Sequence, residues 1–457
     1  MTQRLAWLTP ALAYIPQWLG YQMRATEQPG CALAVAYKGG VVLDLAFGWA
    51  DQGAGVALTP RHRFRVASHS KSFTATAIMK LREQGRLKLD DTAGQYVSGL
   101  HPEIASASLT QLLSHTAGVL RDGPDAGYWV DRKSFLDEAA LRSELALAPA
   151  IEAATRLKYS NHGFGLLGLI IEAVTGEPYG VWVKREIVDA VGLTDTKPDA
   201  PASGPLARGH SSKALLGRRL VFPGDQSTHA LASATGFVST AGDLARFFGQ
   251  LSPNAAESVL SVASRREMSR SQWTDTWAVL PQSYGLGTIS GTFDGWDWFG
   301  HSGGFQGYVT RTAVIPEHDL AISCLTNAVD GMSALWLDGA MAILKRFQAD
   351  GPPRADLADW AGRWWSVWGP NDLLPVGDKV LIAWPGLTNP IAKAGELTVT
   401  GPDAARISQA GAFGNYGEPV RRLRGDAGEV TALQIAASRM VSETELAAEL
   451  TERYERG

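Results

Sequence analysis

Ser68 and Lys71 are the pair of side chains in this sequence with the clearest chemical potential. They lie in the string Arg-Val-Ala-Ser-His-Ser-Lys-Ser-Phe, where a short extended run gives way to helix-forming residues. Residues three apart on a helix share one face, so the lysine amine can reach the serine hydroxyl. A lysine can take the proton of a serine when burial disfavours the charged amine. The spacing predicts an activated nucleophile, although taken alone it also suits a helix N-cap followed by a solvated lysine.

Tyr159 is a second candidate, in the string Lys-Tyr-Ser-Asn that precedes an apolar helical segment. A phenol near a cation loses its proton more easily, so a tyrosine held against Lys71 could pass the proton of the nucleophile to a leaving group. The alternative is structural: a tyrosine in a turn, with Asn161 capping the following helix.

A third candidate is the string Gly300-His301-Ser302-Gly303-Gly304, which opens a β-rich run. Glycines let the backbone approach a substrate, the amide of Gly304 could donate to an oxyanion, and His301 could contact substrate or assist proton transfer. The string also matches the GxSxG elbow of α/β-hydrolases, which would make Ser302 the nucleophile. That elbow needs a helix directly after the serine and then an acid and a histidine, whereas here a β-rich run follows and only His318 lies downstream.

Together, a serine and lysine at a helix start, a Tyr-x-Asn string and a His-x-Gly string on a closing strand resemble the serine β-lactamases and penicillin-recognising DD-peptidases. Two further strings look like the same family, Leu112–Gly118 (Leu-Leu-Ser-His-Thr-Ala-Gly) and Gly236–Leu244. The resemblance covers roughly residues 10 to 348. Within the family it is to the class C branch, which includes D-aminopeptidases, D-amino-acid amidases and carboxylesterases of β-lactamase fold.

The resemblance implies a role for each matching residue. The catalytic positions are Ser68 as nucleophile, Lys71 and Tyr159 as the base pair, and His301; the substrate-binding positions are Asn161, Gly303 and Gly304. The amides of Ser68 and Gly304 would form the oxyanion hole. One departure bears on the substrate, because β-lactamases generally carry lysine where this chain has His301. An imidazole is largely neutral at pH 7, so the charge that would hold a substrate carboxylate is weakened and an ester or amide is favoured.

The elements that must position these residues are readable from the pattern. Two hairpins are predicted, Cys31–Lys38 with Val41–Trp49 across Gly39-Gly40, and Tyr308–Ile315 with Leu320–Thr326. Helical period and cap signals predict helices at Ser68–Gln84, Leu109–Ala117, Gly163–Val174, Asp243–Leu251 and Ser333–Phe347. The glycines of Gly163–Gly168 match a dinucleotide fingerprint, but no strand precedes them, so we interpret them as helix packing.

These elements and the resemblance predict an α/β fold of the β-lactamase and transpeptidase type, an antiparallel sheet flanked by helices with a helical lobe. Residues 198–230 are rich in Pro, Gly, Ser and Arg and predict a long surface loop. Composition changes near Pro352-Pro353, and the tryptophan-rich remainder with short alternating runs predicts a small C-terminal β domain. The predicted domains are a serine hydrolase domain at 1–350 and a β-rich domain at 351–457.

Composition argues against several kinds of partner. The 457 residues carry 42 Lys and Arg against 46 Asp and Glu, so there is no positive surplus for nucleic acid or an anionic membrane. No apolar run reaches the ~18 residues of a spanning helix. The histidines form no metal-binding spacing, and neither metal nor cofactor is predicted. Cys31 and Cys324 lie in apolar runs and are predicted to be buried free thiols.

We therefore expect a hydrolase that forms an acyl-enzyme on Ser68 and cleaves a small ester or amide, D-amino-acid amides and short peptides included. The alternatives are β-lactamase or DD-peptidase activity, and a catalytically silent member that binds a ligand. An aminopeptidase needs an acidic group near the substrate ammonium, for which Asp225 in the long loop is a candidate. We expect a cytoplasmic protein, or a periplasmic or secreted one if residues 5–13 are a cleaved signal. The sequence leaves homo-oligomer formation open.

Overall fold

The computed structural model describes residues 6–201, 203–276, 282–411 and 414–455, and the chain divides into two compact units. The larger unit is Gln28–Leu337, and the smaller combines Met1–Glu27 with Asp338–Gly457. The predicted boundary at residue 350 differs from this division, which falls inside helix α10 (Ser333–Asp350). The N-terminal helix α1 (Leu8–Ala25) also groups with the C-terminal residues, for reasons given below.

The larger unit is built on an antiparallel sheet whose strands follow the order β3-β2-β1-β13-β12-β11-β10-β9-β8. The strands are β1 (Gly30–Tyr37), β2 (Gly40–Asp51), β3 (Val56–Ala57), β8 (Trp273–Asp275), β9 (Gln282–Tyr284), β10 (Ile289–Phe293), β11 (Trp296–Phe305), β12 (Tyr308–Ile315) and β13 (Leu320–Thr326). Both predicted hairpins are confirmed as β1–β2 and β12–β13, which pair with each other through β1 and β13. Cys31 and Cys324 are buried free thiols on these two strands, as predicted.

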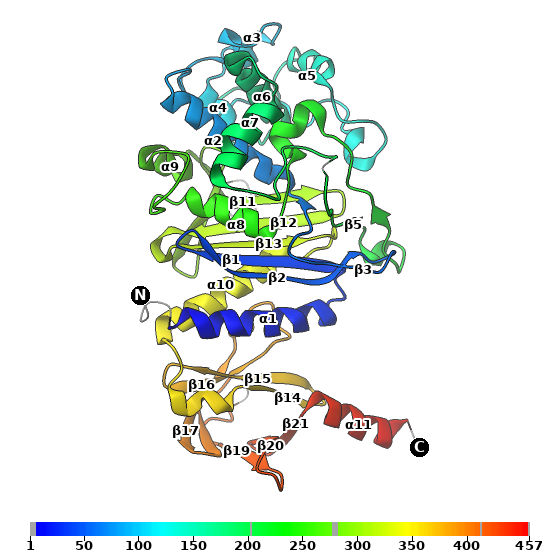
Figure 1. Ribbon diagram of the computed structural model, residues 1–457, viewed down its shortest axis with the longest axis vertical. Coiled ribbons are helices and arrows are strands. Elements are labelled where there is room, and N and C mark those ends of the chain that lie inside the picture. The colour runs from blue at the N-terminus through cyan, green and yellow to red at the C-terminus, as the bar shows by residue number, and fades with distance from the viewer. Residues whose placement is uncertain (1–5, 202, 277–281, 412–413, 456–457) are drawn as a thin grey trace. The chain divides into compact units, whose positions relative to one another are not determined.

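Helices cover this sheet and form a lobe beside it (Figure 1). They are α2 (Ser70–Glu83), α3 (Pro102–Ala105), α4 (Leu109–Leu113), α5 (Glu138–Leu145), α6 (Asn161–Thr175), α7 (Tyr179–Val183), α8 (Ala241–Gln250) and α9 (Val262–Ser269). Helix α8 packs directly on β1, β12 and β13. Helix α4 is shorter than predicted because the chain takes a left-handed turn at His115. The predicted α/β fold, an antiparallel sheet with a helical lobe, is confirmed.

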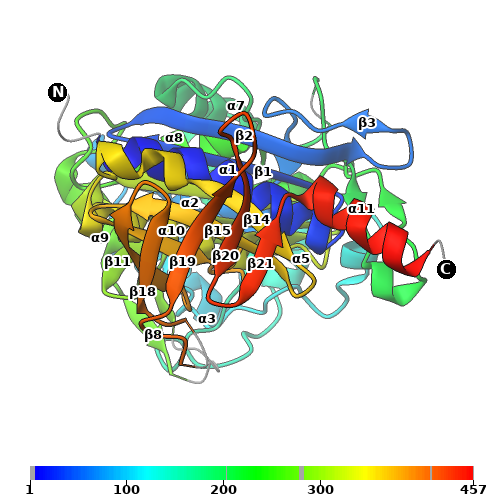
Figure 2. The ribbon, with the colours of Figure 1, turned by 90° about the horizontal axis from the view of Figure 1, so that it is seen from below.

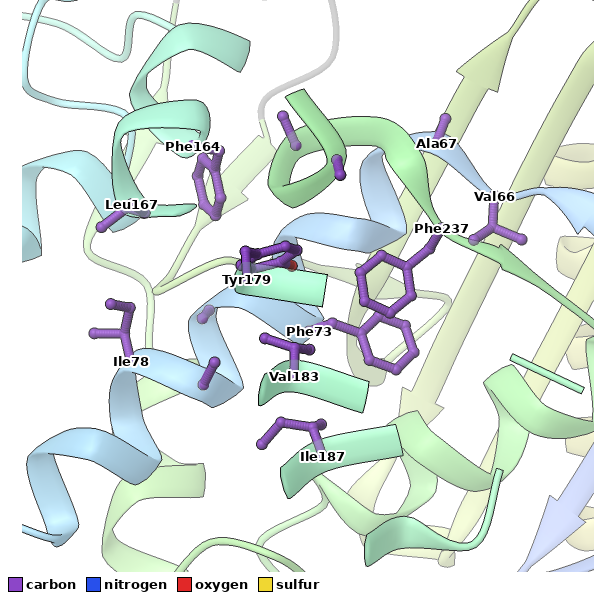
Figure 3. Close-up of a cluster of buried hydrophobic side chains, with 14 of the residues drawn as sticks. Val66, Ala67, Phe73, Ile78, Phe164, Leu167, Tyr179, Val183, Ile187 and Phe237 are labelled. Atoms are coloured by element: carbon purple, nitrogen blue, oxygen red, sulfur yellow. The ribbon is translucent and has the colours of Figure 1, made fainter. Parts of the chain in front are cut away.

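A buried aromatic cluster joins α2 to its neighbours (Figure 3). The ring of Phe73 stacks on Phe237 at 4.3 Å and on Phe247 at 3.8 Å between ring centroids. All three side chains are fully buried. Burying a phenylalanine side chain contributes about 1.5–3 kcal/mol, and stacked pairs add to this. Helix α2 is therefore held firmly just beyond Ser68.

The predicted long loop at 198–230 contains little regular structure. It is interrupted by the short paired strands β5 (Gly209–His210) and β6 (Val221–Phe222) and by single turns of 3-10 helix. Among the described residues, no single helix is both long and apolar enough to cross a membrane; α6 and the segment Tyr179–Asp189 meet that test only together and are bent by 81°.

The smaller unit contains a closed antiparallel barrel in chain order (Figure 2). Its strands are β14 (Gly362–Ser366), β15 (Gly369–Val376), β16 (Lys379–Ala383), β17 (Gly395–Gly401), β18 (Ala404–Gln409), β19 (Pro419–Arg424), β20 (Val430–Ile435) and β21 (Ser438–Val441), followed by α11 (Glu443–Tyr454). Alternating apolar residues such as Val380, Leu397 and Leu433 fill its core. The small β domain predicted from composition is thus a barrel.

Helix α1 belongs to this unit because its buried face binds the barrel. The hydroxyl of Tyr14 donates to Asp372 on β15 at 2.9 Å. The indole of Trp18 donates to the carbonyl of Leu387 at 3.1 Å, and the amide of Gln22 donates to that of Pro385 at 2.6 Å. Trp18 and Gln22 are almost fully buried. Such contacts join residues more than 350 positions apart, which no local pattern reveals.

Candidate active site

Ser68 lies in a short 3-10 helix, Ala67–His69, between strand β4 (Phe64–Arg65) and helix α2. Strand β4 pairs with β7 (Val238–Ser239), and the 3-10 helix rests against β11. Ala67 has a φ of 46°, in the left-handed region that costs a non-glycine residue of order 1–3 kcal/mol. The surrounding structure therefore forces a sharp turn immediately before the serine, whose side chain stays partly exposed.

Lys71 is fully buried one helical turn after Ser68. Its Nζ lies 3.2 Å from Ser68 Oγ, 2.7 Å from Asn161 Oδ1 and 2.9 Å from the carbonyl oxygen of Ala234. Two of these neighbours can only accept hydrogen bonds. A neutral amine has two N–H groups for these acceptors and one lone pair left for the serine hydroxyl. The geometry therefore suits an amine that accepts the proton of Ser68.

The electrostatics around Lys71 agree with this geometry. Burial holds the pKa of Lys71 well below its ordinary value, Asp122 raises it in part, and Arg121 lowers it further. Desolvation disfavours the ammonium form more than the single nearby carboxylate favours it. The predicted pair of Ser68 and Lys71 is brought together, with a lysine able to act as a base.

Tyr159 is also brought to Ser68, but its electrostatics differ from the sequence prediction. The Tyr159 ring lies 4.7 Å from Lys71 Nζ, and Ser68 is near enough to lower the pKa of the phenol in part. We predicted that a neighbouring cation would make the phenol easier to ionise. Instead burial raises the pKa of Tyr159, outweighing the effect of Ser68 and the charge of Arg121. Burial also disfavours the charged form of Lys71, which weakens the expected cation, so the phenol keeps its proton and can donate it.

Asn161 is the first residue of α6 and lies buried between Lys71 and Asp122. Its Oδ1 accepts from Lys71, and its Nδ2 donates to Asp122 Oδ1 at 2.6 Å. Both ends of the amide are thus engaged within the protein, which orients Lys71. The helix cap is not Asn161 but Ser160, whose hydroxyl accepts the N–H of Gly163 at 2.8 Å.

Asp122 was missed by sequence reasoning. Its Oδ1 also accepts from the indole of Trp129 at 3.1 Å, and its Oδ2 lies 3.0 Å from Arg121 Nε. The side chain is 15% exposed, so the carboxylate reaches both the buried Asn161 and the surface. No local motif marks it; the nearest signal is its position shortly after the Leu112–Gly118 string.

His301 lies on the buried face of β11, only 2% exposed. Its Nε2 is 2.9 Å from the hydroxyl of Tyr284, and its Nδ1 is 2.7 Å from the carbonyl oxygen of Ser302. Burial and the neighbouring His69 hold the pKa of His301 well below its ordinary value, so the ring is neutral at pH 7. This placement favours support of the strand over the predicted contact with substrate. Tyr284, its partner, was also missed from sequence.

Gly303 and Gly304 alternate between the two faces of β11. A Cβ on Gly303 would overlap the carbonyl oxygen of Val66 and lie 2.6 Å from Thr310 Oγ1, so glycine lets β11 approach the chain just before Ser68. A Cβ on Gly304 would meet nothing within 4 Å, and this residue is exposed. Gly304 therefore lies on the open face of β11, and its role as oxyanion donor stays a prediction.

The competing motifs have structural explanations. Ser302 lies inside β11, paired with Arg311 on β12, and no helix follows it as an elbow requires. Gly165 and Gly168 lie in α6, where added Cβ atoms would meet Leu141 at 2.8 Å and Ser233 at 2.6 Å, so they serve helix packing.

Asp225, the acidic residue that the sequence offered as a partner for a substrate ammonium, is exposed and lies 3.7 Å from Arg208. Among the described residues, no cluster of His, Cys, Asp and Glu has a metal-binding arrangement.

Comparison with known proteins bears on the family and the fold of this chain. The family model described as Beta-lactamase matches residues 16–342. Penicillin-binding protein 4 of Amycolatopsis lactamdurans is 28% identical over 314 residues, 65% of this chain and 81% of that protein. The octameric penicillin-binding protein homologue of Pyrococcus abyssi has a TM-score of 0.64 at 22% identity, covering 94% of this chain and 99% of its own. The D-amino acid amidase of Ochrobactrum anthropi SV3, complexed with D-phenylalanine, also has a TM-score of 0.64 at 22% identity, covering 74% and 99%. Both structures support the fold alone.

Proposed function

Because the chain belongs to the Beta-lactamase family, we propose that it is a serine hydrolase that cleaves small amides or esters through an acyl-enzyme on Ser68. The observation that carries the proposal is the buried Lys71 amine, 3.2 Å from Ser68 Oγ and held by two carbonyl acceptors. A base positioned in this way can take the proton of a serine and so activate it as a nucleophile.

In the proposed first step, Ser68 Oγ attacks the substrate carbonyl carbon while its proton passes to Lys71 Nζ. The carbonyl oxygen becomes an oxyanion beside the amides of Ser68 and Gly304, which stabilise it. The carbon–leaving-group bond then breaks, with Tyr159 donating its proton to the departing amine or alcohol and recovering one from Lys71. Water attacks the acyl-serine by the reverse proton route, releasing the acid and free Ser68.

Ser68→Ala tests the nucleophile. A fluorophosphonate probe is expected to add one label to the wild type, mapped to Ser68 by mass spectrometry, and none to the variant, with an unchanged circular dichroism spectrum for both. Turnover of p-nitrophenyl acetate should fall to background in the variant. Labelling at Ser302 would move the nucleophile to β11, and an unlabelled wild type would favour the silent ligand-binding alternative.

Asp122 supports a substrate with a free α-ammonium group. Its carboxylate reaches the surface next to Asn161, and its ion pair with Arg121 is weak because the Arg121 side chain is 64% exposed. A substrate ammonium could replace this guanidinium. We therefore propose amino-acid amides and short peptides as the preferred substrates. The β-lactamase or DD-peptidase alternative uses the same corner differently, with Arg121, 5.7 Å from the Tyr159 ring, holding a substrate carboxylate.

Asp122→Asn separates these readings. The variant keeps an oxygen to accept from Asn161 and Trp129 but loses the charge. We expect kcat/KM for D-alanine p-nitroanilide to fall by about 10- to 100-fold more than that for its N-acetyl derivative, the usual worth of a hydrogen bond to a charged group. Arg121→Ala should leave this ratio unchanged or raise it. Equal losses for both substrates would refute the ammonium site, and loss of benzylpenicillin acylation in Arg121→Ala alone would favour the alternative.

For partners, we propose a small-molecule substrate. Self-association is proposed on the likeness to the Pyrococcus abyssi protein, whose structure is described as octameric.

A further inference from the structure

We propose that His115, in the Ser-His-Thr-Ala-Gly string, is a positioning residue that fixes the phenol of Tyr159 beside Ser68. The inference rests on the proposed function, because it assigns His115 a role only through the proton transfer of Tyr159. It is carried by three contacts of the same residue: two with the backbone on either side of Tyr159, and one with the Tyr159 ring.

The backbone contacts hold the chain before and after Tyr159. The carbonyl oxygen of His115 accepts the N–H of Lys158 at 2.7 Å, and its Nδ1 accepts the N–H of Ser160 at 3.1 Å. Ser160 is fixed in turn, because its hydroxyl donates to the carbonyl of Leu120 at 2.6 Å. His115 therefore holds the N–H groups of both residues that flank the tyrosine, Lys158 and Ser160.

The third contact is between rings. The imidazole of His115 lies 4.1 Å from the Tyr159 ring, with an angle of 38° between their planes, and 4.6 Å from the ring of Tyr284. It is 2% exposed and so fills the space between the two tyrosines. Its backbone has a φ of 59°, a conformation that is costly for a side chain of this size and persists only where its surroundings hold it. That strain coincides with a place where a reacting phenol needs a fixed position.

His115 remains neutral in this environment. Because Nδ1 accepts a hydrogen bond, the ring proton is on Nε2, which has no hydrogen-bond partner among the described residues. Burial holds the pKa of His115 well below its ordinary value, and the charges of Lys158 and Arg121 lower it further. The lone pair of Nδ1 already accepts the N–H of Ser160, so the His115 ring cannot replace Lys71 as the base. Its contribution must pass through Tyr159.

A double-mutant cycle tests this. His115→Asn keeps an acceptor for Ser160 and tolerates the left-handed backbone, but removes the ring. We expect kcat for p-nitrophenyl acetate to fall by about 10-fold or more with KM within a factor of two, as for a misplaced catalytic group. In a Tyr159→Phe background the same change should alter kcat by less than twofold, because the positioned hydroxyl is already absent. Equal effects in both backgrounds would overturn the proposal.

Two further variants distinguish folding and function. His115→Phe keeps a ring and loses the acceptor; we expect a lower melting temperature, with its effect on kcat again absent in the Tyr159→Phe background. His62→Asn, a histidine outside the site, should leave kcat unchanged. The fluorophosphonate label on wild-type Ser68 tests the proposed function separately. An unlabelled wild type would contradict that function. A labelled wild type in which His115→Asn has the same effect on kcat with and without Tyr159→Phe would contradict only the role of His115.

Discussion

Replacing Lys71 by methionine is expected to lower kcat/KM for p-nitrophenyl acetate by about 10²- to 10⁴-fold, the usual contribution of a general base. Methionine fills the volume of the lysine stem but offers no basic nitrogen to Ser68. KM should change little, since Lys71 is fully buried and its amine contacts groups of the protein. Steady-state kinetics measures both constants, and a variant within threefold of wild type would contradict the role of the lysine.

The same substitution should change how stability depends on pH. The pKa of Lys71 is depressed in the folded protein, whereas the unfolded chain titrates near the ordinary value of 10.5. Between these values the unfolded chain binds one more proton, so this group raises the unfolding free energy by about 1.4 kcal/mol for each unit of rising pH. This gain in unfolding free energy is complete above pH 10.5. It is lost as the pH falls toward the pKa that Lys71 has in the folded protein.

Urea unfolding of wild type and Lys71→Met at pH 7, 8.5 and 10 measures this effect. The variant is expected to gain stability relative to wild type as the pH is lowered, because it carries no lysine to deprotonate on folding. Taking the difference between the two proteins cancels the other titrating groups. Ser68→Ala keeps Lys71 and should follow the wild-type trend. A constant difference between Lys71→Met and wild type across this range would mean that the lysine folds in its charged form.

Gly303→Ala is expected to destabilise the larger unit by about 1–3 kcal/mol or more, as overpacking of a tight interior does. The added methyl group would overlap the carbonyl oxygen of Val66. That oxygen cannot easily move, since it accepts the N–H of His69 at 3.1 Å and lies 2.9 Å from the His69 ring nitrogen. Relief of the overlap must shift either β11 or the turn that carries Ser68, so fluorophosphonate labelling should slow as well.

Gly304→Ala is the matched control for stability. The same methyl group, one residue along the strand, would meet open space. The unfolding free energy should therefore change by no more than about ±0.5 kcal/mol, as for ordinary surface substitutions, and the melting temperature should change little. Thermal unfolding of the two variants gives the comparison. Equal stability of the two variants would show that β11 does not pack tightly against the carbonyl group of Val66 at Gly303.

The parts of the site that sequence predicts well are those fixed by local geometry. Ser68 and Lys71 are three residues apart at a helix start, so their meeting follows from helix geometry once the helix is recognised. The hairpins follow from alternating apolar runs and from turn residues such as Gly39, whose φ is 81°. Tyr159 and Gly304 were assigned to the site from the order of the motifs along the chain and from the family resemblance, since no local pattern brings them to Ser68.

The remainder depended on burial, which motifs do not encode. His301 and Gly304 lie three residues apart on β11 and so belong to opposite faces of the strand. The register of β11 decides which of the two faces is buried. The direction of the Tyr159 pKa shift depends on how deeply the phenol is buried. The involvement of Asp122 in the site depends on its hydrogen bond with Asn161, 39 residues further along the chain. Each of these properties arises only when separate elements pack together.

The smaller unit is assembled from both ends of the chain, which sets an order of events during synthesis. Helix α1 is synthesised before the larger unit, yet the residues that bind its Tyr14, Trp18 and Gln22 are made only after Gln28–Leu337 has been translated. At ~5–20 residues per second this delay lasts on the order of tens of seconds. During that time the larger unit can complete its own core, while the apolar face of α1 stays without its final partner and within reach of chaperones.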